Sequence, residues 1–111
     1  MKLTGLAPLI GTDEALDRAT GSLASKRNAT LVAPLGVRPP ALAALAQASS
    51  DLPLVVLTAT GREAERLTVA LRSWSDAVEM LPAWETLPHE RLSPQVDTMA
   101  RRIAVLRRLA H

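Results

Sequence analysis

The sequence has no cysteine, no phenylalanine and no tyrosine, and its only aromatic side chains are Trp74 and Trp84. The lack of cysteine excludes disulfides, thiolate nucleophiles and zinc–thiolate sites. With two indoles available, aliphatic side chains have to fill the core. Modules that read single-stranded nucleic acid by stacking bases on several aromatic rings are therefore disfavoured.

The sequence also has little excess of charge of either sign. The 111 residues carry 13 basic and 11 acidic side chains, so the net charge is +2. The isoelectric point of about 9.9 reflects arginine usage rather than a strong basic field. A hydrophobic content of 48% at this length is typical of one soluble domain. No apolar run approaches the ~20 residues of a membrane span. The short run behind Lys2 lacks a clear cleavage site, so we expect a cytoplasmic protein with no membrane partner.

The apolar pattern predicts three short strands, at residues 29–33, 54–58 and 77–81. Helices are expected after Thr12, over 41–48, after Thr60 and over 96–110, and residues 82–94 read as a loop. Alternation of strands and helices predicts an α/β fold, with a parallel sheet and right-handed crossovers.

The loop after the first predicted strand is where a nucleotide-binding α/β domain would hold phosphates. Such a loop needs several glycines, free amides and a lysine followed by a hydroxyl residue. This loop has a single glycine, Gly36, and an arginine, Arg38, but no lysine. Its two prolines, Pro39 and Pro40, have no amide to donate. We therefore expect a degenerate phosphate loop and no cofactor.

Two further patterns leave alternatives open. Thr60 and Glu63 match a capping box, although Thr60 also follows a predicted strand, where it could touch a nucleic-acid backbone. The last helix carries four arginines in a stretch without an acid, which suits the helix dipole and solubility, or contacts with phosphates. They are Arg101, Arg102, Arg107 and Arg108.

Catalytic and metal-binding patterns are scarce. The only imidazoles, His89 and His111, lie in a loop and at the terminus, at spacings that match no metal-ligand pattern. No serine lies in a nucleophile-elbow context. The sequence thus predicts neither a catalytic residue nor a metal site.

One block is more specific than these general patterns. It combines two elements, W-E-T-L-P and S-P-Q-V-D-T, at a fixed spacing after the segment 54–64. This block resembles the N-terminal region of the bacterial transcription-repair coupling factors (Mfd), in particular the actinobacterial type. The resemblance covers residues 29–111 well and the first 28 loosely. Its motif residues are Trp84, Glu85, Thr86, Leu87, Pro88, Ser93, Pro94, Gln95, Asp97 and Thr98.

The resemblance implies a module similar to the excision-repair protein UvrB, a degenerate copy of a helicase domain. The implied fold is a three-layer, RecA-like (P-loop NTPase-like) short parallel sheet flanked by helices, here truncated. Residues 1–28 would form an N-terminal helical segment, and residues 29–111 the first part of the UvrB-like domain. The tyrosine-rich hairpin with which UvrB clamps DNA is missing from this sequence, so lesion binding does not carry over.

Members of that family are ATP-driven DNA translocases that displace stalled RNA polymerase and recruit UvrA, and their motor would lie outside these 111 residues. The resemblance therefore implies a non-catalytic scaffold and interface module. Its partners would be the remainder of the coupling factor and, through the full-length protein, UvrA, RNA polymerase and DNA. A truncated sheet would leave an apolar edge or helix face uncovered. The alternative is a small DNA-binding module that depends on the four arginines of the last helix; a stand-alone nucleotide-dependent enzyme has only the predicted fold in its favour.

Overall fold

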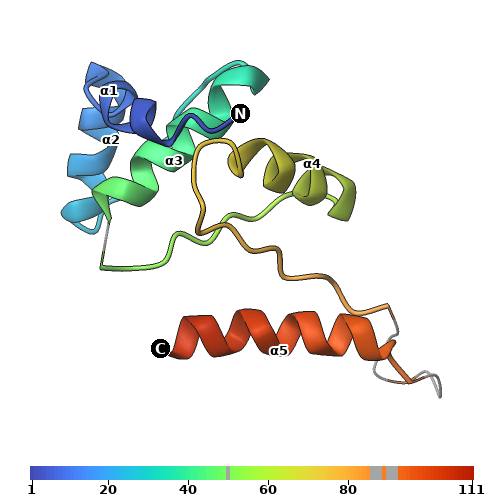
Figure 1. Cartoon of the computed structure of the whole chain (residues 1–111). Coiled ribbons are helices and arrows are strands. Elements are labelled where there is room, and N and C mark those ends of the chain that lie inside the picture. Colours follow the sequence, from blue (N-terminus) through green and yellow to red (C-terminus); the bar gives the residue numbers. More distant parts are fainter. Residues whose placement is uncertain (50, 86–88, 90–92) are drawn as a thin grey trace.

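The computed structural model of the chain describes residues 1–49, 51–85, 89 and 93–111, and the regular structure in these ranges is helical (Figure 1). Within them, no helix combines the length and the hydropathy that crossing a membrane demands. The elements in chain order are η1 (Thr4–Leu6), α1 (Ala7–Ile10), α2 (Glu14–Ala24), η2 (Leu35–Val37), α3 (Arg38–Ala48), α4 (Gly61–Leu71) and α5 (Val96–Ala110).

Helix α3 is the centre of the packing, and α1, α2 and α4 all contact it (Figure 1). The buried apolar side chains between these helices are small, apart from one leucine and one proline. Alanines let helix backbones approach closely, but each contributes little buried area. The buried residues are Ala7 of α1, Leu16 and Ala19 of α2, and Pro40, Ala43 and Ala44 of α3.

Helix α2 begins with a side-chain cap and ends in a left-handed turn. Asp13 caps it, since its carboxylate accepts hydrogen bonds from the amides of Ala15 (2.9 Å) and Leu16 (3.2 Å). The expected cap, Thr12, instead donates to the carbonyl of Leu9 at 2.6 Å. At the other end Lys26 has φ 56°, and the amide of Arg27 donates to the carbonyl of Ser22 (2.9 Å). This is a Schellman ending with lysine where glycine is usual.

The start of α3 explains the proline pair in the sequence. Pro39 and Pro40 lie in the first turn of the helix, where the missing amide costs nothing. Gly36 belongs to η2, and Arg38 is the first residue of α3. The predicted degenerate phosphate loop is therefore a helix start rather than a loop around a phosphate position.

Helix α4 is capped as the sequence predicts. The hydroxyl of Thr60 accepts a hydrogen bond from the amide of Glu63 at 3.2 Å. The helix ends at Leu71, so Trp74 lies beyond it and is partly buried. The N-terminal segment is tied to this end of α4, because the amide of Leu3 donates to the carbonyl of Ser73 at 2.6 Å and Lys2 pairs with Asp76.

The prediction of a three-layer, RecA-like α/β fold is wrong. Residues 29–33, 54–58 and 77–81 connect helices without forming strands, and no backbone hydrogen bond joins these segments. Leu57, in the most strand-like of them, is 91% exposed. The reason is physical: an apolar, β-branched run fits a buried strand, but it becomes one only where neighbours supply the paired backbone groups and a covering layer.

The absence of a sheet among the described residues leaves the molecule loosely packed. Its Cα radius of gyration is 16.0 Å, whereas a compact domain of this length would have about 13 Å. Figure 1 shows residues 51–60 and 75–85 running as open segments, with α5 apart from the other helices. Helix α5 nevertheless begins and ends where the sequence predicts, at 96 and 110.

Candidate interaction site

Glu85 holds the N-terminal end of α5. One carboxylate oxygen, Oε1, accepts a hydrogen bond from the hydroxyl of Thr98 at 2.7 Å, and Oε2 accepts one from the amide of Gln95 at 3.3 Å. Thr98 is 6% exposed, which is the lowest exposure of any described α5 residue. We call these three residues the Glu85 latch. Gln95 provides no side-chain cap of its own, so Glu85 caps the helix from ten residues upstream.

The position of this carboxylate also suits the electrostatics of the helix. The first turn of a helix presents unpaired amides and the positive end of the helix dipole, and both favour a nearby negative charge. Asp97 adds a second carboxylate to the same turn and pairs with Arg101 one turn later, with 3.0 Å between Nε and Oδ2. The latch therefore stabilises the start of α5 by hydrogen bonding and by charge.

Arg102 makes a second attachment, one turn beyond Thr98. Its guanidinium carbon lies 4.4 Å from the centroid of the Trp84 ring, and its Nη1 donates to the carbonyl of Pro82. This is a cation–π contact combined with a charge-assisted hydrogen bond. Together with the Glu85 latch, it fixes α5 to residues 82–85 along its first two turns.

Two of the other arginines of the last helix form exposed ion pairs with side chains of this chain. Arg108 forms an ion pair with Glu79, and Arg101 pairs with Asp97. In the part of the chain that the structure describes, Arg107 is exposed and has no ion pair. Of the four arginines for which phosphate contact was the alternative to a solvated helix end, only Arg107 thus presents a guanidinium without an ion pair among the described residues.

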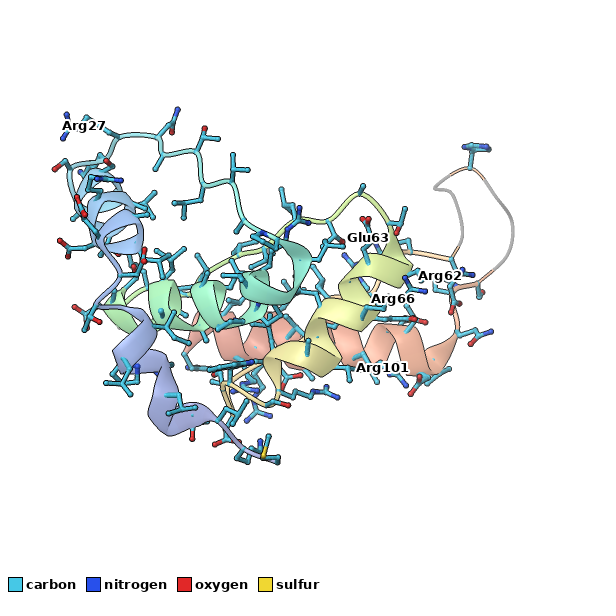
Figure 2. All side chains as sticks on the ribbon, turned by 90° about the horizontal axis from the view of Figure 1, so that it is seen from above. Arg27, Arg62, Glu63, Arg66 and Arg101 are labelled. Carbon is cyan, nitrogen blue, oxygen red and sulfur yellow. The ribbon has the colours of Figure 1, made fainter. Side chains whose placement is uncertain are left out.

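Among the described residues, the remaining basic side chains are not gathered into one surface. A groove between α4 and α5 is lined by charges of both signs, from Glu65 and Arg72 on one side and Glu79 and Arg101 on the other. Figure 2 shows Arg62 and Arg66 on α4 and Arg27 near the opposite end of the molecule. Mixed charge of this kind is unlike the continuous basic stripe of a phosphate-binding surface.

The motif residues from sequence fall into three groups. Trp84, Glu85, Gln95 and Thr98 come together at the start of α5. Ser93 and Pro94 precede that helix, and Asp97 lies in its first turn. Thr86, Leu87 and Pro88 lie outside the described residues. Thr60 caps α4, and its hydroxyl serves that helix.

Sequence reasoning missed the partner of Trp84. The sequence identified Trp84 as a motif residue only, and the structure shows an exposed ring that stacks with Arg102. The sequence spacing gives part of this contact: Thr98 and Arg102 are four residues apart, so they share one face of a helix. In the structure Glu85 and Trp84 lie against that face. Among the described residues, no cluster of histidine, aspartate and glutamate could hold a metal ion.

Comparison with known proteins finds similarity to transcription-repair-coupling factors. No family model matches the chain, and no solved structure does. The chain is 57% identical over 83 residues to the transcription-repair-coupling factors of Mycobacterium bovis and Mycobacterium tuberculosis. The match covers 74% of this chain, and it spans 6% of the length of each of these curated relatives. The resemblance to the transcription-repair-coupling factors is thereby confirmed, and the chain contains a region derived from them.

Proposed function

We propose that the chain acts as a non-catalytic scaffold and interface segment of a transcription-repair coupling factor, in the part of that protein that resembles UvrB. The observation that carries the proposal is the 57% identity over 83 residues to two coupling factors. The 83 matched residues are a small part of those relatives, so the activity of the whole protein would belong to other segments.

The chemistry of the Glu85 latch supports a holding role. Both oxygens of Glu85 accept hydrogen bonds, and Arg102 is occupied by the Pro82 carbonyl and the Trp84 ring. A carboxylate that transfers protons needs an accessible oxygen aimed at a substrate. The polar groups of Glu85 and Arg102 instead form the contacts that hold α5. The hydrogen bond between Glu85 and the amide of Gln95 also joins residues 85 and 95.

In this proposal the remainder of the coupling factor is the immediate partner. UvrA, RNA polymerase and DNA would be engaged through the full-length protein, whose ATP-driven motor lies in other segments. The exposed apolar side chains of residues 54–57 support such an arrangement. Apolar surface of this kind is typical of regions that are covered in a larger assembly.

A chimaera tests the proposal. The matched segment of the Mycobacterium tuberculosis coupling factor is replaced by the matched residues of this chain, and release of stalled RNA polymerase and ATP hydrolysis are measured. We expect both activities to be retained. In the same chimaera, Glu85→Ala with Thr98→Val should reduce polymerase release while ATP hydrolysis stays at the chimaera's level. A folded chimaera that hydrolyses ATP but releases no polymerase would contradict the scaffold role.

The chain alone provides the control. A scaffold segment should hydrolyse no ATP, so turnover by the purified 111-residue chain would contradict the non-catalytic part of the proposal.

A duplex-DNA titration at two salt concentrations tests the arginine-dependent alternative. Phosphate contacts give a log–log salt slope of roughly one for each neutralised phosphate. Because three of the four arginines already contact groups of this chain, we expect no binding at low salt.

A further inference from the structure

Helix α5 is attached through its polar side. Thr98, Arg102 and Val105 lie along one face of the helix; Thr98 is buried and the other two are partly buried. The apolar stripe of the same helix lies roughly a third of a turn away from this face, and Ile103 and Leu106 in it are 62% and 53% exposed. No other described helix makes more than a marginal contact with α5. The face that an amphipathic helix normally buries is therefore uncovered.

The uncovered stripe has the spacing of a coiled-coil seam. Its residues recur at intervals of three, four, three and four, which assigns them alternately to the a and d positions of a heptad repeat. Ile103 at a and Leu106 at d are the pair that favours two-stranded packing. At 1.5 Å per residue, the stripe is about 21 Å long. It consists of Val96, Met99, Ile103, Leu106 and Ala110.

The charges that border the stripe determine what can cover it. In this register Arg102 occupies a g position and Arg107 an e position. A parallel pair of α5 helices would set Arg102 of one copy against Arg107 of the other, because g faces the following e of the partner. An antiparallel pair would set each arginine against its own equivalent. Both arrangements of two copies therefore place like charges opposite each other.

We propose that the outward stripe of α5 docks an amphipathic helix of a partner polypeptide that carries apolar residues at its a and d positions and glutamate at e and g. Arg107 is the main selecting charge, because it has no ion pair within the described part of the chain and lies beside Leu106. Arg102 contributes a second positive charge while it remains stacked on Trp84. The proposal does not depend on the function proposed above.

Binding of designed peptides to the full 111-residue chain tests this surface. Three labelled helical peptides of three heptads share isoleucine at a and leucine at d, and carry glutamate, glutamine or lysine at e and g. Fluorescence anisotropy should show the glutamate peptide binding about fivefold more tightly than the glutamine peptide. The lysine peptide should bind most weakly. Salt should remove most of the difference between the glutamate and glutamine peptides.

Variants locate the binding. Ile103→Ala with Leu106→Ala should weaken the glutamate peptide by at least about tenfold, because both a buried a and a buried d side chain are lost. Arg107→Glu should invert the preference, so that the lysine peptide binds best. Val69→Ala removes an exposed apolar side chain from α4 and should leave binding unchanged.

Three results would overturn the proposal. Equal affinity of the three peptides would show that no charge selection occurs. A stable dimer of the chain in sedimentation that Ile103→Ala with Leu106→Ala dissociates would assign the stripe to a second copy. Binding of phosphatidylserine vesicles that Ile103→Ala with Leu106→Ala abolishes, with no peptide binding, would assign it to a membrane surface.

Discussion

Helices α1 and α2 are held to α3 by burial of mostly small apolar side chains, and α4 contacts α3 without a buried residue of its own, whereas α5 is held to residues 79–85 by polar contacts. The first kind of attachment has no preferred direction and grows with the area removed from water. The second depends on hydrogen-bond geometry at a few atoms. The two regions should therefore respond differently to mutation.

The difference extends to cooperativity. In the α1–α4 region each helix contacts α3, so loss of one contact weakens its neighbours. Helix α5 is fixed at its N-terminal half by Glu85 and Arg102, and further along by the Arg108–Glu79 pair. Exposed ion pairs contribute about 0–1 kcal/mol. We expect α5 to open locally at a lower free-energy cost than unfolding of the α1–α4 region.

The largest effect is expected from Leu16→Ala. Leu16 is 7% exposed and is the one large aliphatic side chain buried between the described helices. Truncation should lower the free energy of unfolding by about 3 kcal/mol, from lost transfer free energy and a residual cavity. Urea denaturation followed by circular dichroism measures it.

Leu23→Ala is the matched control, because Leu23 lies on the same helix but is largely exposed. Its effect should be well below 1 kcal/mol. Equal losses for the two variants would contradict a core centred on Leu16, and with it the distinction between the two regions.

Glu85→Ala should release α5 while leaving the α1–α4 region folded. The change removes a helix cap and leaves the buried Thr98 hydroxyl without its acceptor, at a cost of about 1.5 kcal/mol. Hydrogen exchange should accelerate by about tenfold at the first amides of α5 and stay unchanged in α3.

Glu65→Ala serves as the control, since this exposed α4 carboxylate lies in the groove next to α5 but outside the latch. Should Glu85→Ala accelerate exchange equally in α3 and α5, the two regions would unfold as one unit.

Helices α2 to α5 were predictable from sequence, whereas the predicted sheet was wrong, for a reason visible at particular residues. The ends of α5, the Thr60 cap and the proline start of α3 are local features, decided by chemistry within a few residues. Leu54, Val55 and Val56 have the composition of a buried strand, but pairing depends on what lies beside them in space. An apolar composition shows that these residues could be buried, not that they are, and in this structure they remain exposed.

For the candidate site, the sequence identified the residues but not their contacts. The block around Trp84, Glu85, Gln95 and Thr98 was singled out by resemblance, and the structure brings these four together. That Glu85 caps a helix ten residues away could not be predicted, because such a bond depends on how the intervening segment returns. The role of Arg102 was also missed, because its four-residue spacing from Thr98 predicts a shared helix face but not which residues lie against that face.

Arg102→Lys tests whether the positive charge at this position or the planar guanidinium group holds α5. Lysine keeps the positive charge but loses the planar group that stacks on Trp84 and donates to Pro82. We expect a loss of about 0.8 kcal/mol in the stability of α5, in the range of an exposed cation–π contact. The indole N–H resonance of Trp84 should shift, whereas that of Trp74 should stay in place.

A double-mutant cycle with Trp84→Leu checks the pairing directly. A coupling free energy near zero would mean that Arg102 holds α5 through the Pro82 carbonyl alone.

Lys26→Gly should stabilise the α1–α4 region without affecting α5. Lys26 has φ 56° at the end of α2, a conformation that is costly for a side chain with a Cβ and free for glycine. Because glycine also gains entropy in the unfolded chain, the net gain should be about 0.5 kcal/mol. Lys26→Ala removes the same charge but keeps the Cβ, so it should give no gain. Urea denaturation measures the gain, and hydrogen exchange at the start of α5 should stay at the wild-type rate; a matching slowdown there would show that α5 opens only when α1–α4 unfolds.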